Sequence, residues 1–114
     1  MTWHGLYYDA MTRKMFALTY SYVKDILAKR APYRDAHLKL ANEHRAKGLL
    51  ISGGPLLDGG QPVGALFLFS SPSKDVVDKF VLDDPYVSAH LVPTHSIFEY
   101  SVVVGELAAP SSKL

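Results

Sequence analysis

His37 and Asp84 are the two residues of this chain whose types best suit acid–base chemistry. An unperturbed imidazole has a pKa of about 6.5, so a histidine can accept or donate a proton near neutral pH once a partner fixes its tautomer. A carboxylate is the usual partner, and Asp84 stands before Pro85, at a corner where its oxygens can accept a ring N–H. The two positions are far apart in the sequence, so this pair requires a fold that brings them together.

Further residues have types that suit the binding of a small molecule. Arg30 and Arg34 can clamp an anionic group through two parallel hydrogen bonds. The bare N–H groups of Gly53 and Gly54 can line a pocket. With His37 and Asp84 as the catalytic candidates, the candidates for substrate contact are Arg34, Arg30, Tyr20, Gly54, Pro55 and Tyr86.

Each of these residues also has a purely structural interpretation. A histidine on a helix is more often a hydrogen-bonded core residue than a catalyst, and an aspartate before proline is an ordinary helix stop or Asx turn. Most arginines at the start of a helix are solvated. Tyr20 and Tyr22 fit a hydrophobic core or a dimer interface. The residues alone leave both interpretations open.

No pattern in the sequence indicates a metal or a cofactor. His37 and His44 are seven residues apart, too distant for one ion, and the third ligand of a helical zinc site is missing. The glycines between residues 53 and 64 fit neither the P-loop nor the dinucleotide-binding fingerprint. The chain has no cysteine, which excludes thiolate catalysis, disulfides and Cys-ligated metal centres. We therefore expect no metal and no cofactor.

The charge and hydrophobic patterns argue against nucleic-acid binding and against a membrane-spanning helix. Twelve Lys and Arg residues against eleven Asp and Glu residues, with the signs interspersed, provide no field for a polyphosphate backbone. The longest apolar runs, such as residues 64–69, are far shorter than the roughly 20 residues that a membrane helix needs. We expect neither nucleic-acid binding nor a membrane span.

The elements that must position these residues follow from the hydrophobic periodicity. Strict alternation over residues 15–23 and 96–104 predicts the first and last strands, and apolar runs at 49–52 and 63–69 predict two buried strands. Residues 53–55 should turn or kink the chain, and residues 56–62 should form a loop with an Asp-Gly hairpin signal. With two helices the order is βαββαβ, which predicts an α+β, ferredoxin-like sandwich.

Two helices are predicted between these strands. The first should begin at Pro32, a favoured first helical position, and should end at Gly48. The second should have Ser71 as N-cap and Pro72 at its first position, and should end at residues 83–85. The residues that share the buried stripe are Tyr33, His37, Leu40, Ala41 and His44 in the first helix, and Val76, Val77, Phe80 and Val81 in the second.

This arrangement leaves one face of the sheet without helices. Since the strands carry apolar residues on both faces, a monomer would expose a large apolar patch. We therefore expect a two-fold symmetric homodimer, packed sheet against sheet.

The ends of the chain differ in character from the middle. Residues 1–14 are expected to form an N-terminal extension, residues 15–104 the folded domain, and residues 105–114 a flexible tail. The expected location is the cytoplasm. Ser112, Lys113 and Leu114 match a carboxyl-terminal peroxisomal signal, which makes the peroxisome the alternative.

Over residues 15–100 the chain resembles the YCII-like (YciI-like) family of the dimeric α+β barrel superfamily. The matching motifs occur in family order, and only their combination is specific. They are Arg30, Arg34 and His37 in RAPYRDAHL, Gly48-Leu49-Leu50, Gly53-Gly54-Pro55 with Asp58-Gly59, Gly64-Ala65, and Asp83-Asp84-Pro85-Tyr86.

The resemblance implies a ferredoxin-like dimer with a site built on the positions of His37 and Asp84. Within the family, a dehydrochlorinase of a chlorinated hydroquinone-type ring is the branch with clear chemistry. The leading hypothesis is a small cofactor-independent enzyme of isomerase, lyase or dehydrochlorinase type, in which His37 is the general acid–base and Asp84 orients it. The alternative is a non-catalytic dimer that binds a small molecule or acts as an interaction module.

Overall fold

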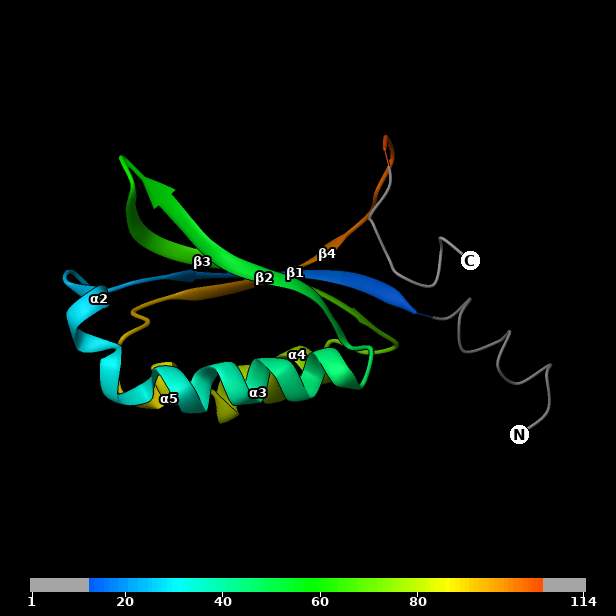
Figure 1. Cartoon of the computed structure of the whole chain (residues 1–114). Helices are drawn as coiled ribbons and strands as arrows, with labels where there is room; N and C mark the ends of the chain where they lie inside the picture. Colours follow the sequence, from blue (N-terminus) through cyan, green and yellow to red (C-terminus); the bar gives the residue numbers. More distant parts are fainter. Residues whose placement is uncertain (1–12, 106–114) are drawn as a thin grey trace.

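The computed structural model describes residues 13–105. Four antiparallel strands form one sheet in the order β2-β3-β1-β4, in which β1 is Lys14–Ser21, β2 Leu50–Asp58, β3 Gln61–Ser71 and β4 His95–Tyr100. Helices α3 (Arg34–Ala46) and α4 (Asp75–Asp83) lie together on one face of this sheet (Figure 1). Short helical segments α2 (Ile26–Lys29), η1 (Ala31–Tyr33) and α5 (Pro85–Ser88) complete the fold. The predicted α+β, ferredoxin-like arrangement is confirmed.

The core lies between the sheet and the two long helices. Alternate residues of β1 point toward the helices, so Leu18 pairs with Phe67 of β3 on the same side of the sheet. Phe80 of α4 closes this layer, with its ring centroid 5.3 Å from that of Phe67. The buried apolar residues of this layer are Phe16, Leu18, Tyr20, Leu50, Ala65, Phe67, Phe69, Val77, Phe80 and Val81.

Helix α3 matches the predicted stripe except at its start. A single 3₁₀ turn, η1, precedes it and carries Pro32, and Tyr33 at the junction is 38% exposed rather than buried. The α-helical ladder begins only at Arg34, so Tyr33 does not share the direction of the stripe. His37 and His44 are both buried, as predicted. Gly48 follows the helix with a φ of +76°, the left-handed conformation that glycine adopts at low cost.

Strand β2 is longer than predicted. Gly53 and Pro55 continue the strand instead of turning it, and residues 56–62 are not a loop, because β2 extends to Asp58 and β3 begins at Gln61. Pro55 is tolerated because β2 is the edge strand of the sheet, where a missing N–H costs little. A register shift between Leu50 and Ser52 marks an irregularity near the start of the strand.

Two further boundaries differ from the predictions. Ser71 ends β3 instead of capping α4, and its hydroxyl donates to the Ser73 carbonyl at 2.8 Å. The hydroxyl of Ser73 accepts the Asp75 N–H at 3.0 Å, so a serine two positions later leads into the helix. Strand β4 ends at Tyr100 rather than at residue 104, because its pairing with β1 ends there.

The face of the sheet opposite the helices is apolar, and within residues 13–105 no helix covers it (Figure 1). The strand register places Met15, Ala17, Leu66, Leu68, Phe98 and Tyr100 on this open face. Phe98 is 63% exposed. The open face is thus the surface on which the sequence predicts a partner.

Several predictions concern residues beyond this part of the chain. Residues 1–12 of the extension predicted over 1–14, and residues 106–114 of the tail predicted over 105–114, with Ser112, Lys113 and Leu114, lie outside the described residues. Among the helices of residues 13–105, none is long and apolar enough to cross a membrane.

Candidate active site

The fold brings His37 and Asp84 into direct contact. Nδ1 of His37, on α3, lies 2.9 Å from Oδ1 of Asp84, at the corner between α4 and α5. The Asp84 side chain is completely buried, and that of His37 is 8% exposed. A carboxylate oxygen accepts, so Nδ1–H donates and the tautomer of a neutral His37 is set, with Nε2 as the free acceptor.

Asp84 is held by three donors. Besides His37, the Tyr20 hydroxyl donates to Oδ2 at 2.7 Å and the Tyr86 backbone N–H donates to Oδ1 at 2.9 Å. The last bond is a helix N-cap, which forms because Pro85 stops α4 and starts α5. Buried carboxylates need such partners, and three donors fix this one in place.

The ring of His37 is fixed by packing as well as by hydrogen bonding. It stacks on the ring of Tyr86, with centroids 3.9 Å apart and planes 5° apart. Phe67 meets it edge to face, with a centroid distance of 6.1 Å. Within the described residues, Nε2 of His37 has no hydrogen-bond partner. The imidazole is therefore preorganised, and one nitrogen remains available to a ligand.

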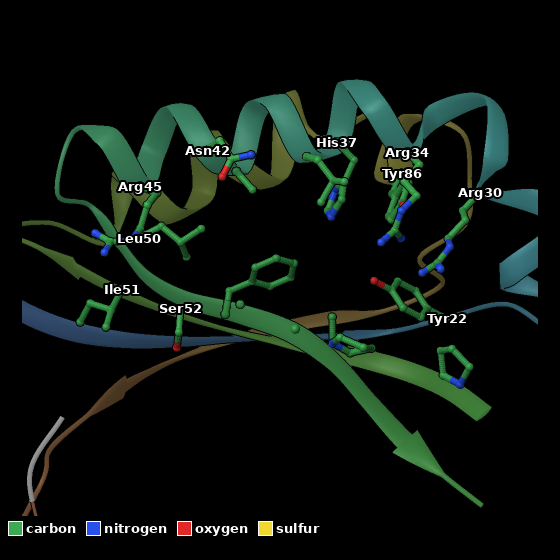
Figure 2. Close-up of a pocket in the computed structure, with 18 residues that line it drawn as sticks. Tyr22, Arg30, Arg34, His37, Asn42, Arg45, Leu50, Ile51, Ser52 and Tyr86 are labelled. Atoms are coloured by element: carbon green, nitrogen blue, oxygen red, sulfur yellow. The ribbon is translucent and has the colours of Figure 1, made fainter. Parts of the chain in front are cut away.

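A cavity of about 530 Å³ lies between α3 and strands β2 and β3, and His37 lines it. The lining residues of α3 recur at helical spacing, because the cavity follows one face of the helix. Figure 2 shows His37 pointing from α3 toward the sheet, with Arg34 and Arg30 at one end of the row and Arg45 at the other. The α3 residues that line the cavity are Arg34, His37, Leu38, Ala41, Asn42 and Arg45.

One end of this cavity is lined by cationic and phenolic side chains. We call it the α2 end, and it is formed by Tyr22, Arg30, Arg34 and Tyr86 (Figure 2). Burial raises the pKa of Tyr22 to about 12, with smaller contributions from Tyr86 and Asp84. Burial also raises the pKa of Tyr86, and the charges of Arg30 and Arg34 oppose that rise. Both phenols are therefore protonated donors at neutral pH.

The sheet side of the cavity is shaped by glycines. Gly53 lies against the ring of Phe67, where a Cβ would be 2.8 Å from Cδ2, whereas a Cβ at Gly54 would meet nothing within 4 Å. Both line the cavity together with Pro55. Five of the six predicted contact residues line the cavity, namely Arg34, Arg30, Gly54, Pro55 and Tyr86.

Tyr20 is placed differently from the predicted contact position. It is 2% exposed and does not line the cavity, and its hydroxyl is bonded to Asp84. Burial, followed by the charge of Asp84, raises its pKa well above the usual range. Tyr20 thus lies behind the carboxylate, where its hydroxyl can only position Asp84.

Sequence reasoning missed Tyr22, Phe67 and Arg45 as lining residues. A signal existed for Tyr22, because it continues the alternation of Leu18 and Tyr20 onto the helix side of the sheet. Phe67 and Arg45 carried no such signal, since a core phenylalanine and a surface arginine have the same local patterns wherever a cavity lies.

The contacts of His44, the second buried histidine of α3, are those of a structural core residue. Its Nδ1–H donates to the Leu40 carbonyl at 3.0 Å, and its ring packs edge to face on Phe80 at 5.1 Å. Within residues 13–105, no three His, Cys, Asp or Glu side chains are grouped closely enough to hold a metal ion. His37 is therefore the buried histidine that a ligand can reach.

The sheet order and the helices on one face define an α+β protein with a ferredoxin-like fold. A family model described as the YCII-related domain matches residues 15–101. The chain therefore belongs to the YCII-related family.

Solved structures show the same fold. The chain is similar to 5-chloro-2-hydroxyhydroquinone dehydrochlorinase from Burkholderia phenoliruptrix AC1100, in complex with 2,5-dihydroxybenzoquinone, at 22% identity and a TM-score of 0.65, covering 76% of this chain and 93% of that one. A candidate antibiotic biosynthesis monooxygenase from Bacteroides thetaiotaomicron VPI-5482 matches at 8% identity and a TM-score of 0.56, covering 88% and 98%. Among curated proteins, none matches the sequence.

Proposed function

We propose that this protein is a small cofactor-independent enzyme in which His37 is a general acid–base for a small oxygen-bearing organic molecule. The observation that carries the proposal is the contact of 2.9 Å between Nδ1 of His37 and Oδ1 of Asp84, beside a cavity that Nε2 can reach. Asp84 orients the ring and stabilises the imidazolium that forms when Nε2 takes a proton. Arg34 and Arg30 bind or polarise the oxygen of the substrate.

The reaction type that fits is proton transfer at an activated carbon, as in isomerisation, elimination or lyase chemistry. Nε2 removes a proton from the carbon, and the electron pair moves toward the oxygen near Arg34. In an isomerisation the proton is then returned to another atom of the same molecule. In an elimination the electron pair moves back and expels a leaving group as an anion, and His37 passes its proton to solvent. A positioned acid–base group contributes roughly 10²- to 10⁴-fold, which is sufficient for an activated substrate without a cofactor. The similar fold of a dehydrochlorinase that binds a dihydroxybenzoquinone supports this class.

We further propose that the enzyme is a homodimer through the open face of the sheet. The support is the row of apolar side chains on that face, including Phe98 and Tyr100, which are 63% and 43% exposed. Soluble monomers seldom expose a continuous apolar surface of this kind. The same face in a second copy would be its natural complement under two-fold symmetry.

Exchange of carbon-bound hydrogen for solvent deuterium tests the acid–base role without knowledge of the natural substrate. A panel of small ketones, carboxylic acids and hydroxyquinones would be incubated with the protein in D₂O and followed by proton NMR. We expect exchange with some members of the panel. His37→Gln should slow it by roughly 10²- to 10⁴-fold, because the proton acceptor is lost.

His44→Gln is the matched control, because it removes the other buried histidine of the same helix. It should leave the exchange rate within a small factor of wild type in folded protein. If His37→Gln retained full exchange, the acid–base role would be refuted. Absence of exchange for the whole panel, combined with saturable binding, would favour the non-catalytic binding protein.

A further inference from the structure

The hydroxyl of Tyr86 is a buried donor without an acceptor. Tyr86 is 1% exposed, and its O–H meets no acceptor among residues 13–105, because the neighbouring guanidinium of Arg34 can only donate. Buried tyrosine hydroxyls are normally hydrogen-bonded, so an orphaned one in a site requires an explanation. The residue lines the cavity beside His37, on which its ring is stacked. An acceptor oxygen of a bound ligand would satisfy this hydroxyl.

The other groups at the α2 end of the cavity are also donors. Within the part of the chain that the structure describes, neither Arg30 nor Arg34 forms a salt bridge. The Tyr22 phenol adds a second hydroxyl donor on the opposite side of the opening (Figure 2). None of the described residues that line the cavity is acidic, so at this end four donors, two of them cationic, converge without an anion among residues 13–105.

The position of these donors relative to His37 restricts the ligand. Arg34 and His37 are three residues apart on α3, about one helical turn, so they face the same part of the cavity. The planar fork of a guanidinium matches the two oxygens of a carboxylate. Next to His37 the wall has an apolar section formed by Leu38, Ala41 and Leu50, which suits the hydrocarbon body of a small acid, before Asn42 and Arg45 at the far end.

We propose that Tyr22, Arg30, Arg34 and Tyr86 form a carboxylate subsite and that the protein binds small carboxylic acids. The carboxylate lies at the α2 end, and the adjoining carbon faces Nε2 of His37. This inference rests on the proposed function, because it names the class of molecule on which His37 acts.

Calorimetric titration of the full chain with benzoate tests the subsite, with benzyl alcohol as an uncharged probe of similar shape and inorganic phosphate as a second anion. Benzoate should bind at least about tenfold more tightly than benzyl alcohol. Arg34→Gln and Arg30→Gln should each weaken benzoate binding by about ten- to hundredfold, as expected for loss of a charge-assisted hydrogen bond. Arg45→Gln, at the far end of the same helix face, should change it by less than about twofold.

Tyr86→Phe distinguishes ligand binding from a structural role. It should weaken benzoate binding by about three- to tenfold while leaving the melting temperature of the ligand-free protein unchanged or higher, since the O–H it removes has no acceptor. A lower melting temperature with unchanged benzoate affinity would overturn the assignment of Tyr86. Equal losses for Arg34→Gln and Arg45→Gln would overturn the location of the subsite, and tighter binding of phosphate at the same arginines would overturn the carboxylate class.

His37→Gln separates this inference from the proposed function. Benzoate affinity should stay within about threefold of wild type in this variant while deuterium exchange is lost. Retained exchange in His37→Gln together with lost benzoate binding in Arg34→Gln would refute the acid–base role and leave the subsite standing. Lost exchange in His37→Gln together with normal benzoate binding in Arg34→Gln would refute the carboxylate subsite and leave the acid–base role standing.

Discussion

The ring of His37 lies flat on the ring of Tyr86, with centroids 3.9 Å apart, while Asp84, two residues earlier, holds the edge of the same imidazole at 2.9 Å. One corner of the chain thus fixes both the face and the edge of the histidine. The corner is itself rigid, because Asp84 accepts the backbone N–H of Tyr86 and Pro85 limits the backbone between them. The position of His37 is therefore set by a local turn and not by a flexible loop.

Replacement of Asp84 by alanine should destabilise the fold strongly. The substitution leaves three buried donors, from His37, Tyr20 and the Tyr86 backbone, without their acceptor. We expect a loss of about 3–5 kcal/mol in the free energy of unfolding, the range for breaking a buried pair. Urea denaturation of the two proteins measures this difference.

Asp83→Ala is the matched control for that experiment. Asp83 is the preceding residue, and its side chain forms an exposed pair with Lys79 at 2.7 Å. Its removal should cost less than about 1 kcal/mol. Similar losses for the two variants would show that the network around Asp84 contributes nothing beyond surface electrostatics.

Alanine at Gly53 should disturb the sheet side of the cavity, whereas alanine at Gly54 should not. The new methyl group at position 53 would lie 2.8 Å from the Phe67 ring, which must then shift. Overpacking of this kind costs about 1–3 kcal/mol. Since position 54 is open, Gly54→Ala should stay within about 0.5 kcal/mol of wild type. Thermal unfolding of both variants checks the contrast, and a more stable Gly53→Ala would contradict it.

Aspartate at Phe98 should weaken association of the protein. Phe98 lies on the open face of the sheet, where the proposed dimer would bury the charge between two copies. We expect the dissociation constant of the dimer to rise by at least about tenfold, measured by sedimentation equilibrium. Leu82→Asp is the control, because Leu82 is 77% exposed on α4, on the helix side of the molecule. A stable dimer in Phe98→Asp would place the interface elsewhere.

Alkaline pH should destabilise the protein through its buried tyrosines. Burial raises the pKa of folded Tyr22 from 10.0 to about 12, while the unfolded chain keeps the ordinary value. The contribution of Tyr22 is therefore complete below pH 10 and is lost between pH 10 and 12, as the unfolded state gives up its proton first. The shifts of Tyr20 and Tyr86 have the same sign.

Melting temperatures recorded from pH 8 to 11.5 measure this effect. The melting temperatures should fall above pH 10, and the fall should be shallower in Tyr22→Phe. The difference corresponds to up to about 1 kcal/mol per pH unit in the free energy of unfolding. Tyr33→Phe, at a tyrosine that is 38% exposed, should leave the slope unchanged. Identical slopes for wild type and Tyr22→Phe would refute the role of Tyr22.

The sequence by itself determined the number, type and order of the main elements. Alternation in β1 and the helical spacing of His37 and His44 are local patterns, and burial of one face of a strand or helix imposes them wherever the element packs. For the same reason the sequence predicted that His37 is buried and that the sheet has an uncovered apolar face. The proline at position 85 likewise marked the corner that carries Asp84.

Only the tertiary structure decided what these residues contact. The bond between His37 and Asp84 and the place of Tyr20 behind the carboxylate depend on how α3 and the α4–α5 corner pack on the sheet. The continuation of β2 through Gly53 and Pro55 depends on its edge position, which no local propensity encodes. The orphaned hydroxyl of Tyr86 and the converging arginines are likewise properties of packing, because long-range distances and solvent exclusion arise only once the chain has folded.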